Sequence, residues 1–234
     1  MNSPKAGFTR IELLALLTAL TLFLVVTAPL LANTRPSSTR ALCSNNLRLI
    51  GVAMQRWAND HVERVVWGTL PKDGGTAAGG NPGKIGIGWI EFAYLSNELS
   101  SPRILVCPQD QSTKTAEDFT SGAASFVNSG FRGNALSYTL QFDSELIRPR
   151  SVLASDRDFR CPSGTASCSR GGNGVRFISS AINDHTVMWT NGVHQGFGHL
   201  LYADGSVEVA NSSELWSKLV TSDENGSLHF APPR

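Results

Sequence analysis

Histidine and aspartate residues gather in the last third of the chain, where they could bind a metal ion or a partner. His194 precedes the pair Asp204-Gly205 by ten positions. Imidazole nitrogens and carboxylate oxygens are common metal ligands, so one interpretation is a metal or partner site built on His194 and Asp204. The alternative, which we favour, is structural: Asp204 shapes a turn and His194 forms hydrogen bonds with nearby backbone.

The residues around this pair carry no recognisable catalytic motif. His185, His199 and Asp184 lie close in sequence, but the chain has no HExxH pair and no GxSxG elbow. Gly86-Ile87-Gly88 lacks the spacing of a phosphate-binding loop. Calcium needs roughly six to eight oxygen ligands, and no dense Asp/Asn loop supplies them. We therefore expect no enzyme, no catalytic residue and no metal or other cofactor, with calcium kept open as a weak alternative.

Four cysteines are available for disulfide bonds: Cys43, Cys107, Cys161 and Cys168. They form no CxxC pair, which argues against a zinc ribbon. Cys161 and Cys168 share one loop rich in Gly and Ser, and we expect a disulfide between them once the domain is exported. Cys43 and Cys107 either form a second bridge or remain buried thiols, and the sequence leaves both alternatives open.

Length and composition narrow the class of protein. The chain has 234 residues and a formal net charge of +1, so bulk electrostatics give no reason to expect nucleic-acid binding. Its 22 glycines and its charged fraction of 17% favour a loop-rich domain containing strands over a helical bundle. Roughly 200 residues follow the apolar N-terminal segment, which is enough for one domain with its own core.

The N-terminal segment is organised for a membrane. Gly7 and Phe8 precede Glu12, and an uncharged apolar run covers residues 13–32. This run is long enough to cross a bilayer, since a membrane helix needs ~20 residues. A secretory signal peptide would need a small-residue cleavage site, for which Val26-Thr27-Ala28 is a fair match. A plain single-pass anchor explains the length of the run but not Gly7, Phe8 or Glu12.

These residues resemble the N-terminal signature of type IV pilins and type II secretion pseudopilins. In that family a short basic leader ends in Gly, Phe is the first mature residue and Glu is the fifth, which matches Gly7, Phe8 and Glu12. The resemblance implies that a prepilin peptidase cleaves between Gly7 and Phe8 and N-methylates Phe8. Pro29 lies where many members carry a proline that kinks the helix.

The resemblance also implies how Glu12 would act in assembly. In the family this carboxylate meets an N-terminal ammonium group, either its own or that of a neighbouring subunit. An unpaired charge in a low-dielectric helix bundle is costly, so such a pair would set the register between subunits. Residues 43–51 and the H-x9-DG spacing of His194, Asp204 and Gly205 are similar to a large pseudopilin-like subgroup.

An amphipathic helix is predicted after the membrane segment. Apolar residues recur there at intervals of four and three, which places them on one helix face and predicts packing onto a sheet. They are Cys43, Leu47, Ile50, Met54 and Trp57. Pro36 lies in the polar stretch 33–38 and marks a break before this helix.

The rest of the chain predicts short strands and turns. We expect a short helix at 88–99 and strands at 135–142, 151–155 and 187–190. The clearest signal is a hairpin over 199–210 with Asp204-Gly205 as a two-residue turn. Asn211, with Glu214 three residues later, predicts the start of a helix.

The predicted fold class is α+β: a long N-terminal membrane-spanning helix and an amphipathic stem packed on a small antiparallel β-sheet, as in pilins. The predicted parts are a leader (1–7), a transmembrane and assembly helix (8–32), a helical stem (33–60) and an extracytoplasmic domain (61–234). The expected location is the inner membrane, crossed once, with the C-terminal domain in the periplasm.

The predicted function is structural, as a pseudopilin or pilin-like subunit of a type II secretion or type IV pilus-like filament. Its expected partners are copies of itself, other pseudopilins, prepilin peptidase and the inner-membrane assembly platform. The alternative is a membrane-tethered extracytoplasmic binding module.

Overall fold

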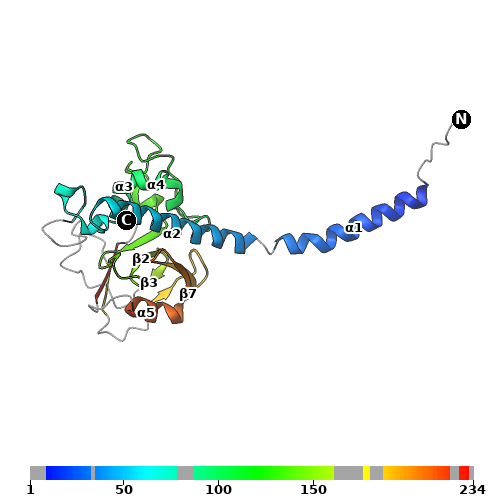
Figure 1. Cartoon of the computed structure of the whole chain (residues 1–234). Coiled ribbons are helices and arrows are strands. Elements are labelled where there is room, and N and C mark those ends of the chain that lie inside the picture. Colours follow the sequence, from blue (N-terminus) through cyan, green and yellow to red (C-terminus); the bar gives the residue numbers. More distant parts are fainter. Residues whose placement is uncertain are drawn as a thin grey trace. The chain divides into compact units, whose positions relative to one another are not determined.

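The computed structural model describes residues 9–32, 35–77, 87–160, 176–179, 187–221 and 227–231. They divide into two compact units, Met1–Thr39 and Arg40–Arg234, and each is described by itself. Helices and an antiparallel sheet make up the second unit, which confirms a mixed α+β class (Figure 1). The predicted bridge between Cys161 and Cys168 lies outside the described residues, as do Gly7 and Phe8.

The first unit contains α1 (Arg10–Ala32), which carries the apolar run. Its stretch Arg10–Thr27 has a mean hydropathy of 2.0, and none of this stretch is buried. By length and composition it is the one described helix that could cross a membrane. Backbone helix continues through Pro29 to Ala32, and the kink expected at Pro29 stays a prediction.

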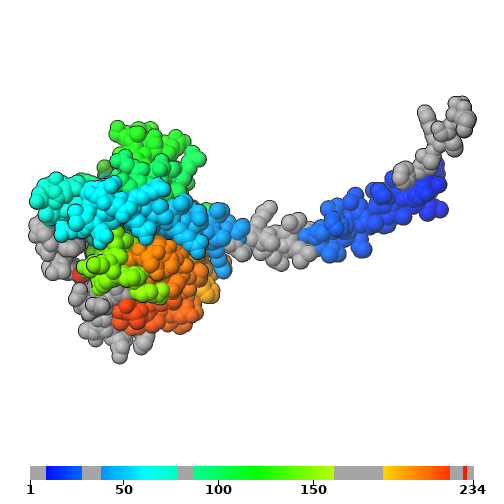
Figure 2. Space-filling view, in the orientation of Figure 1, coloured from blue at the N-terminus to red at the C-terminus, as the bar shows by residue number. Residues whose placement is uncertain are grey.

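Helix α2 (Arg35–Asp60) is the amphipathic stem. Pro36 is its second residue, in the first turn, where a missing backbone N–H costs little. Pro36 therefore does not interrupt α2, which is helical from Arg35 onward. Every member of the predicted apolar stripe is buried: Cys43, Leu47, Ile50, Met54 and Trp57. The opposite side of α2 lies at the surface, where Leu42, Leu49 and Val52 are exposed (Figure 2).

The central sheet has six described strands in the order β4-β8-β1-β2-β6-β7, and all its pairs are antiparallel. A second, two-stranded sheet joins β3 to β5. The strands are β1 (Tyr138–Gln141), β2 (Val152–Asp156), β3 (Phe159–Arg160), β4 (Arg176–Ser179), β5 (Met188–Trp189), β6 (Phe197–Tyr202), β7 (Val207–Asn211) and β8 (Ser227–Ala231).

Two apolar clusters lie on opposite faces of this sheet. The larger one contains the stripe of α2 and Leu201, and the smaller one contains Leu200, Tyr202 and the inner face of α5 (Ser212–Thr221). Successive side chains of a strand point to opposite faces, which explains how β6 serves both clusters. Helix α2 approaches β6 closely at Gly51, where a Cβ atom would lie 2.9 Å from Leu201 Cδ1.

The turn between β6 and β7 differs from the two-residue prediction. The N–H of Gly205 donates to the carbonyl of Tyr202 (2.9 Å), and the N–H of Tyr202 donates to the carbonyl of Ser206 (2.9 Å). Gly205 has a φ of 81°, whereas Asp204 is not among the residues with positive φ. The loop is thus a three-residue turn with Gly205 in the left-handed position. Asp204 accepts a hydrogen bond from the N–H of Ser206 (2.8 Å) and stabilises this turn.

The predicted start of α5 is confirmed in atomic detail. The N–H of Glu214 donates to Asn211 Oδ1 (3.0 Å), and the N–H of Asn211 donates to Glu214 Oε2 (3.3 Å). This reciprocal pair is a capping box.

The helix predicted at 88–99 is present as two short helices. The remaining helical segments are η1 (Val66–Gly68), η2 (Pro71–Asp73), α3 (Gly88–Tyr94), α4 (Ser96–Leu99), η3 (Pro102–Leu105) and η4 (Arg132–Ala135).

Candidate functional site

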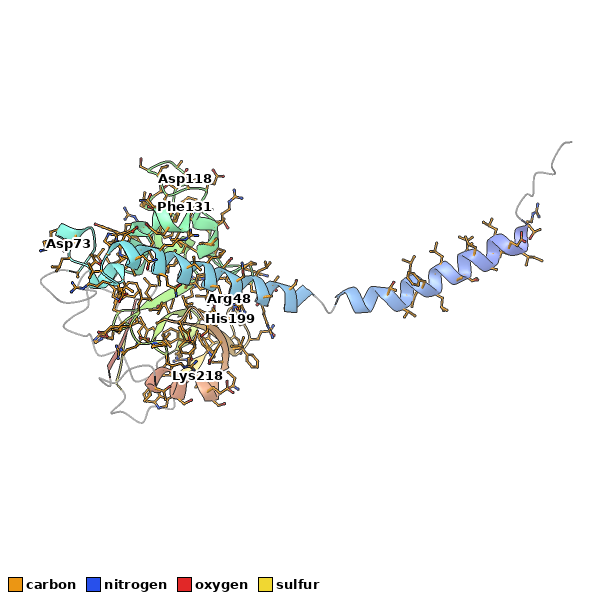
Figure 3. The ribbon with its side chains drawn as sticks, in the orientation of Figure 1. Arg48, Asp73, Asp118, Phe131, His199 and Lys218 are labelled. Carbon is orange, nitrogen blue, oxygen red and sulfur yellow. A yellow bond between two sulfur atoms is a disulfide. The ribbon has the colours of Figure 1, made fainter. Side chains whose placement is uncertain are left out.

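A carboxylate and two imidazoles meet inside the second unit. Asp156 is the last residue of β2, His199 lies in β6, and His194 lies in the loop before β6. The register pairs Ser155 with Leu200, which brings the next residues, Asp156 and His199, together. Asp156 and His194 are each 1% exposed and His199 is 3% exposed. Figure 3 shows His199 inside the second unit. We call Asp156, His194 and His199 the Asp-His-His cluster.

One carboxylate oxygen is the centre of this cluster. Asp156 Oδ2 accepts hydrogen bonds from the backbone N–H of His199 (2.7 Å) and lies 2.8 Å from His199 Nδ1. His194 Nε2 lies 3.3 Å from the same oxygen. The two imidazole rings are 4.8 Å apart between centroids and nearly perpendicular. The other oxygen, Asp156 Oδ1, is buried and has no hydrogen-bond partner among the described residues.

The surroundings keep Asp156 ionised. Burial alone would raise its pKa, but the hydrogen bonds and positive charge offered by His194 and His199 outweigh burial and hold the pKa below its ordinary value. The neighbouring Arg157 does not supply this charge, because its guanidinium pairs with Asp110 at 2.8 Å. The buried negative charge is therefore balanced by the imidazoles or by a bound cation.

His194 is oriented by the segment that follows η3. Its Nδ1 lies 2.5 Å from Gln109 Oε1, and its Nε2 lies 3.5 Å from Cys107 Sγ. Cys107 forms a disulfide with Cys43, and this answers the question that the sequence left open. The bond joins α2 to a segment 64 residues later, with both cysteines fully buried.

The sequence predicted some of these residues and missed others. His194 and His199 were both singled out, but the structure joins them to Asp156 and not to Asp204. His194 precedes β6 and Asp204 follows it, and a six-residue strand separates its ends by roughly 17–20 Å. Asp204 shapes the hairpin turn, as the structural interpretation expected. Among the described residues, the contacts of the His194 ring are with side chains and not with backbone, contrary to the expectation from the sequence. Asp156 could have been noticed as a charged residue ending an apolar strand.

A second aspartate–histidine pair has the same local geometry. Asp143 Oδ2 accepts a hydrogen bond from the backbone N–H of His229 (2.6 Å) and lies 2.6 Å from His229 Nδ1. Asp156 and His199 make the same two contacts. An aspartate–histidine pair of this geometry therefore occurs twice in the second unit. The Asp-His-His cluster differs from the Asp143–His229 pair because it contains a second imidazole, that of His194.

A groove of about 450 Å³ lies beyond the C-terminal end of α2. Among its lining residues are Arg64, Trp67, Phe142, Glu145 and Ile147. It combines apolar walls with charged groups, as pockets for small ligands do.

No protein family, curated protein or solved structure matches this chain.

At the N-terminus, Glu12 forms a capping box with Thr9. The N–H of Thr9 donates to Glu12 Oε2 (2.8 Å), and the N–H of Glu12 donates to Thr9 Oγ1 (3.3 Å). Glu12 is thus bound to the first described residue of the chain. This contact gives the carboxylate a local role in starting α1.

Proposed function

We propose that this chain is a pseudopilin-like structural subunit, anchored by α1 and processed between Gly7 and Phe8. The observation that carries the proposal is the arrangement of Gly7, Phe8 and Glu12 directly before an apolar helix. That helix is followed by a stem whose apolar face packs on an antiparallel sheet. Along its sequence, such a chain carries an apolar helix of membrane length followed by a folded domain.

The contact between Glu12 and Thr9 supports a role in assembly. Cleavage after Gly7 leaves Phe8 as the N-terminal residue, one position before Thr9. The Glu12 carboxylate accepts a hydrogen bond from the backbone N–H of Thr9. After cleavage, Thr9 is the sequence neighbour of the residue that carries the free ammonium group. In an apolar helix bundle this acid needs a cationic partner, and the ammonium of the same or a neighbouring subunit provides it.

The mature N-terminus tests the proposal. Mass spectrometry of the chain purified from its native membrane should find N-methylated Phe8 as the first residue. Replacing Gly7 should block this processing. A first residue of Pro29, after Val26-Thr27-Ala28, or of Asn33, at the end of the apolar run, would refute the proposal in favour of an ordinary signal peptide. Retention of Met1 would refute it in favour of a membrane-tethered binding module, for which the groove beside Trp67 offers a ligand site.

Assembly is tested separately with Glu12→Ala. We expect this variant to be cleaved but to assemble poorly into filaments, because the bundle loses the acid that fixes its register. Arg10→Ala is the matched control, since it changes a charge in the same helical turn. Normal filament yield from Glu12→Ala would contradict the register argument even if processing occurs as proposed.

A further inference from the structure

The Asp-His-His cluster has the composition and spacing of a metal site. The ligand atoms that Asp156, His194 and His199 offer all lie within 4.8 Å of one another. Imidazole nitrogen and carboxylate oxygen together suit zinc and neighbouring divalent transition metals better than calcium or magnesium, which prefer oxygen alone. We propose that Asp156, His194 and His199 bind one divalent transition-metal ion, with zinc as the best chemical fit.

The distances require little rearrangement. Ligands bound tetrahedrally at roughly 2.0–2.2 Å from zinc lie about 3.3–3.6 Å from one another. His194 Nε2 and Asp156 Oδ2 are already 3.3 Å apart. His199 Nδ1 and Asp156 Oδ2 are 2.8 Å apart, a hydrogen-bond distance that widens by roughly 0.5 Å when a metal replaces the shared proton.

The second oxygen of Asp156 also indicates that a partner is missing from the cluster. Asp156 Oδ1 is buried, and no described residue donates a hydrogen bond to it. A buried acceptor without a partner destabilises the fold. A metal ion bound here would take one ligand atom from each of the three residues and would neutralise the buried charge of Asp156.

The hydrogen bond to Gln109 orients His194 as a ligand. If Nδ1 donates its proton to the amide oxygen of Gln109, Nε2 faces Asp156 Oδ2 with either a proton or a metal ion between them. A metal ion at this position would replace the proton that the two atoms otherwise share. Metal-binding histidines commonly donate their other N–H to an oxygen in this way.

The bridged cysteines are not counted among the ligands. Cys43 and Cys107 lie within ligand distance of His194, but a disulfide sulfur is not a thiolate. The burial of all three proposed ligands indicates a closed structural site, filled as the chain folds. Its expected effect is to hold the loop before β6 against β2.

The test uses the full-length chain in detergent micelles, with its disulfides intact. The buried site is emptied by unfolding in EDTA, and the chain is refolded with Zn²⁺ or without metal. We expect about one zinc per folded chain by elemental analysis and a higher melting temperature with zinc. Zinc-edge X-ray absorption of the wild type should show imidazole scattering and no sulfur ligand. This measurement uses the wild type alone, so its outcome does not depend on whether a variant folds.

Matched histidine variants locate the metal. His194→Gln should bind at least tenfold less zinc, whereas His229→Gln, which alters the other aspartate–histidine pair, should bind as the wild type does. The proposal is overturned if folded wild type binds no zinc, if His194→Gln binds it as well as His229→Gln does, or if X-ray absorption shows sulfur ligands. None of these results depends on how the N-terminus is processed.

Discussion

Glu91 carries a buried carboxyl group that should make the stability of the second unit depend on pH. The side chain lies in α3 and is fully buried. Thr76 Oγ1 donates to Glu91 Oε2 (2.6 Å), while Oε1 has no hydrogen-bond partner among the described residues. Burial raises the pKa of Glu91 from 4.5 to about 7, against the opposing effect of the Thr76 hydrogen bond.

The sign of the effect follows from proton binding. Between pH 4.5 and about 7 the unfolded chain has released the proton of Glu91 while the folded chain still holds it. The free energy of unfolding therefore falls as pH rises through this window, and the full loss is present above pH 7. At roughly 1.4 kcal/mol per pH unit, the window corresponds to a loss of about 3 kcal/mol.

Glu91→Gln removes this dependence and keeps an oxygen for Thr76. We expect the free energy of unfolding of the wild type to fall by about 3 kcal/mol more than that of Glu91→Gln between pH 4.5 and pH 8. Urea unfolding followed by tryptophan fluorescence measures both. Glu117→Gln, at an exposed position, is the control and should follow the wild type. Equal pH dependence in wild type and Glu91→Gln would refute the reasoning.

Three further substitutions test local features of the fold. Replacing Cys43 and Cys107 by Ala opens a loop with a sequence separation of 64 and should lower the free energy of unfolding in urea by about 4 kcal/mol. Gly205→Ala adds a Cβ to a residue whose φ is 81° and should lower the free energy of unfolding by about 1–2 kcal/mol, measured by thermal unfolding. Gly205→Asn should lower it less. Asn211→Ala removes the cap of α5 and should cost about 1 kcal/mol in the same assay, whereas Ser213→Ala should cost less.

Local patterns in the sequence predicted the elements well. The apolar stripe of α2 was predicted from its spacing alone, because a helix that packs on a sheet needs one continuous apolar face. The capping box of Asn211 and Glu214 was equally predictable, since both partners lie within one turn. The hairpin was placed correctly, but its turn type was not. Asp-Gly fits both a two-residue turn and a three-residue turn, and the strand register decides between them.

The site was harder to predict because its residues meet only through tertiary structure. Asp156 and His199 are 43 positions apart and become neighbours through the register of β2 and β6. The bond between Cys43 and Cys107 depends on where the segment after η3 lies against α2. Counting residues between His194 and Asp204 therefore pointed to a pair that an intervening strand holds apart.

The disulfide determines how the second unit responds to a pulling force. Tension applied through the N-terminal segment enters this unit at Arg40 and reaches Cys43 within three residues. From there a covalent bond passes it directly to Cys107, so α2 cannot be peeled from the sheet turn by turn beginning at its N-terminal end. In reduced protein the same tension would act on the noncovalent contacts of the helix one after another. A force that enters at Arg40 therefore meets a covalent bond before it reaches the helix contacts that follow Cys43.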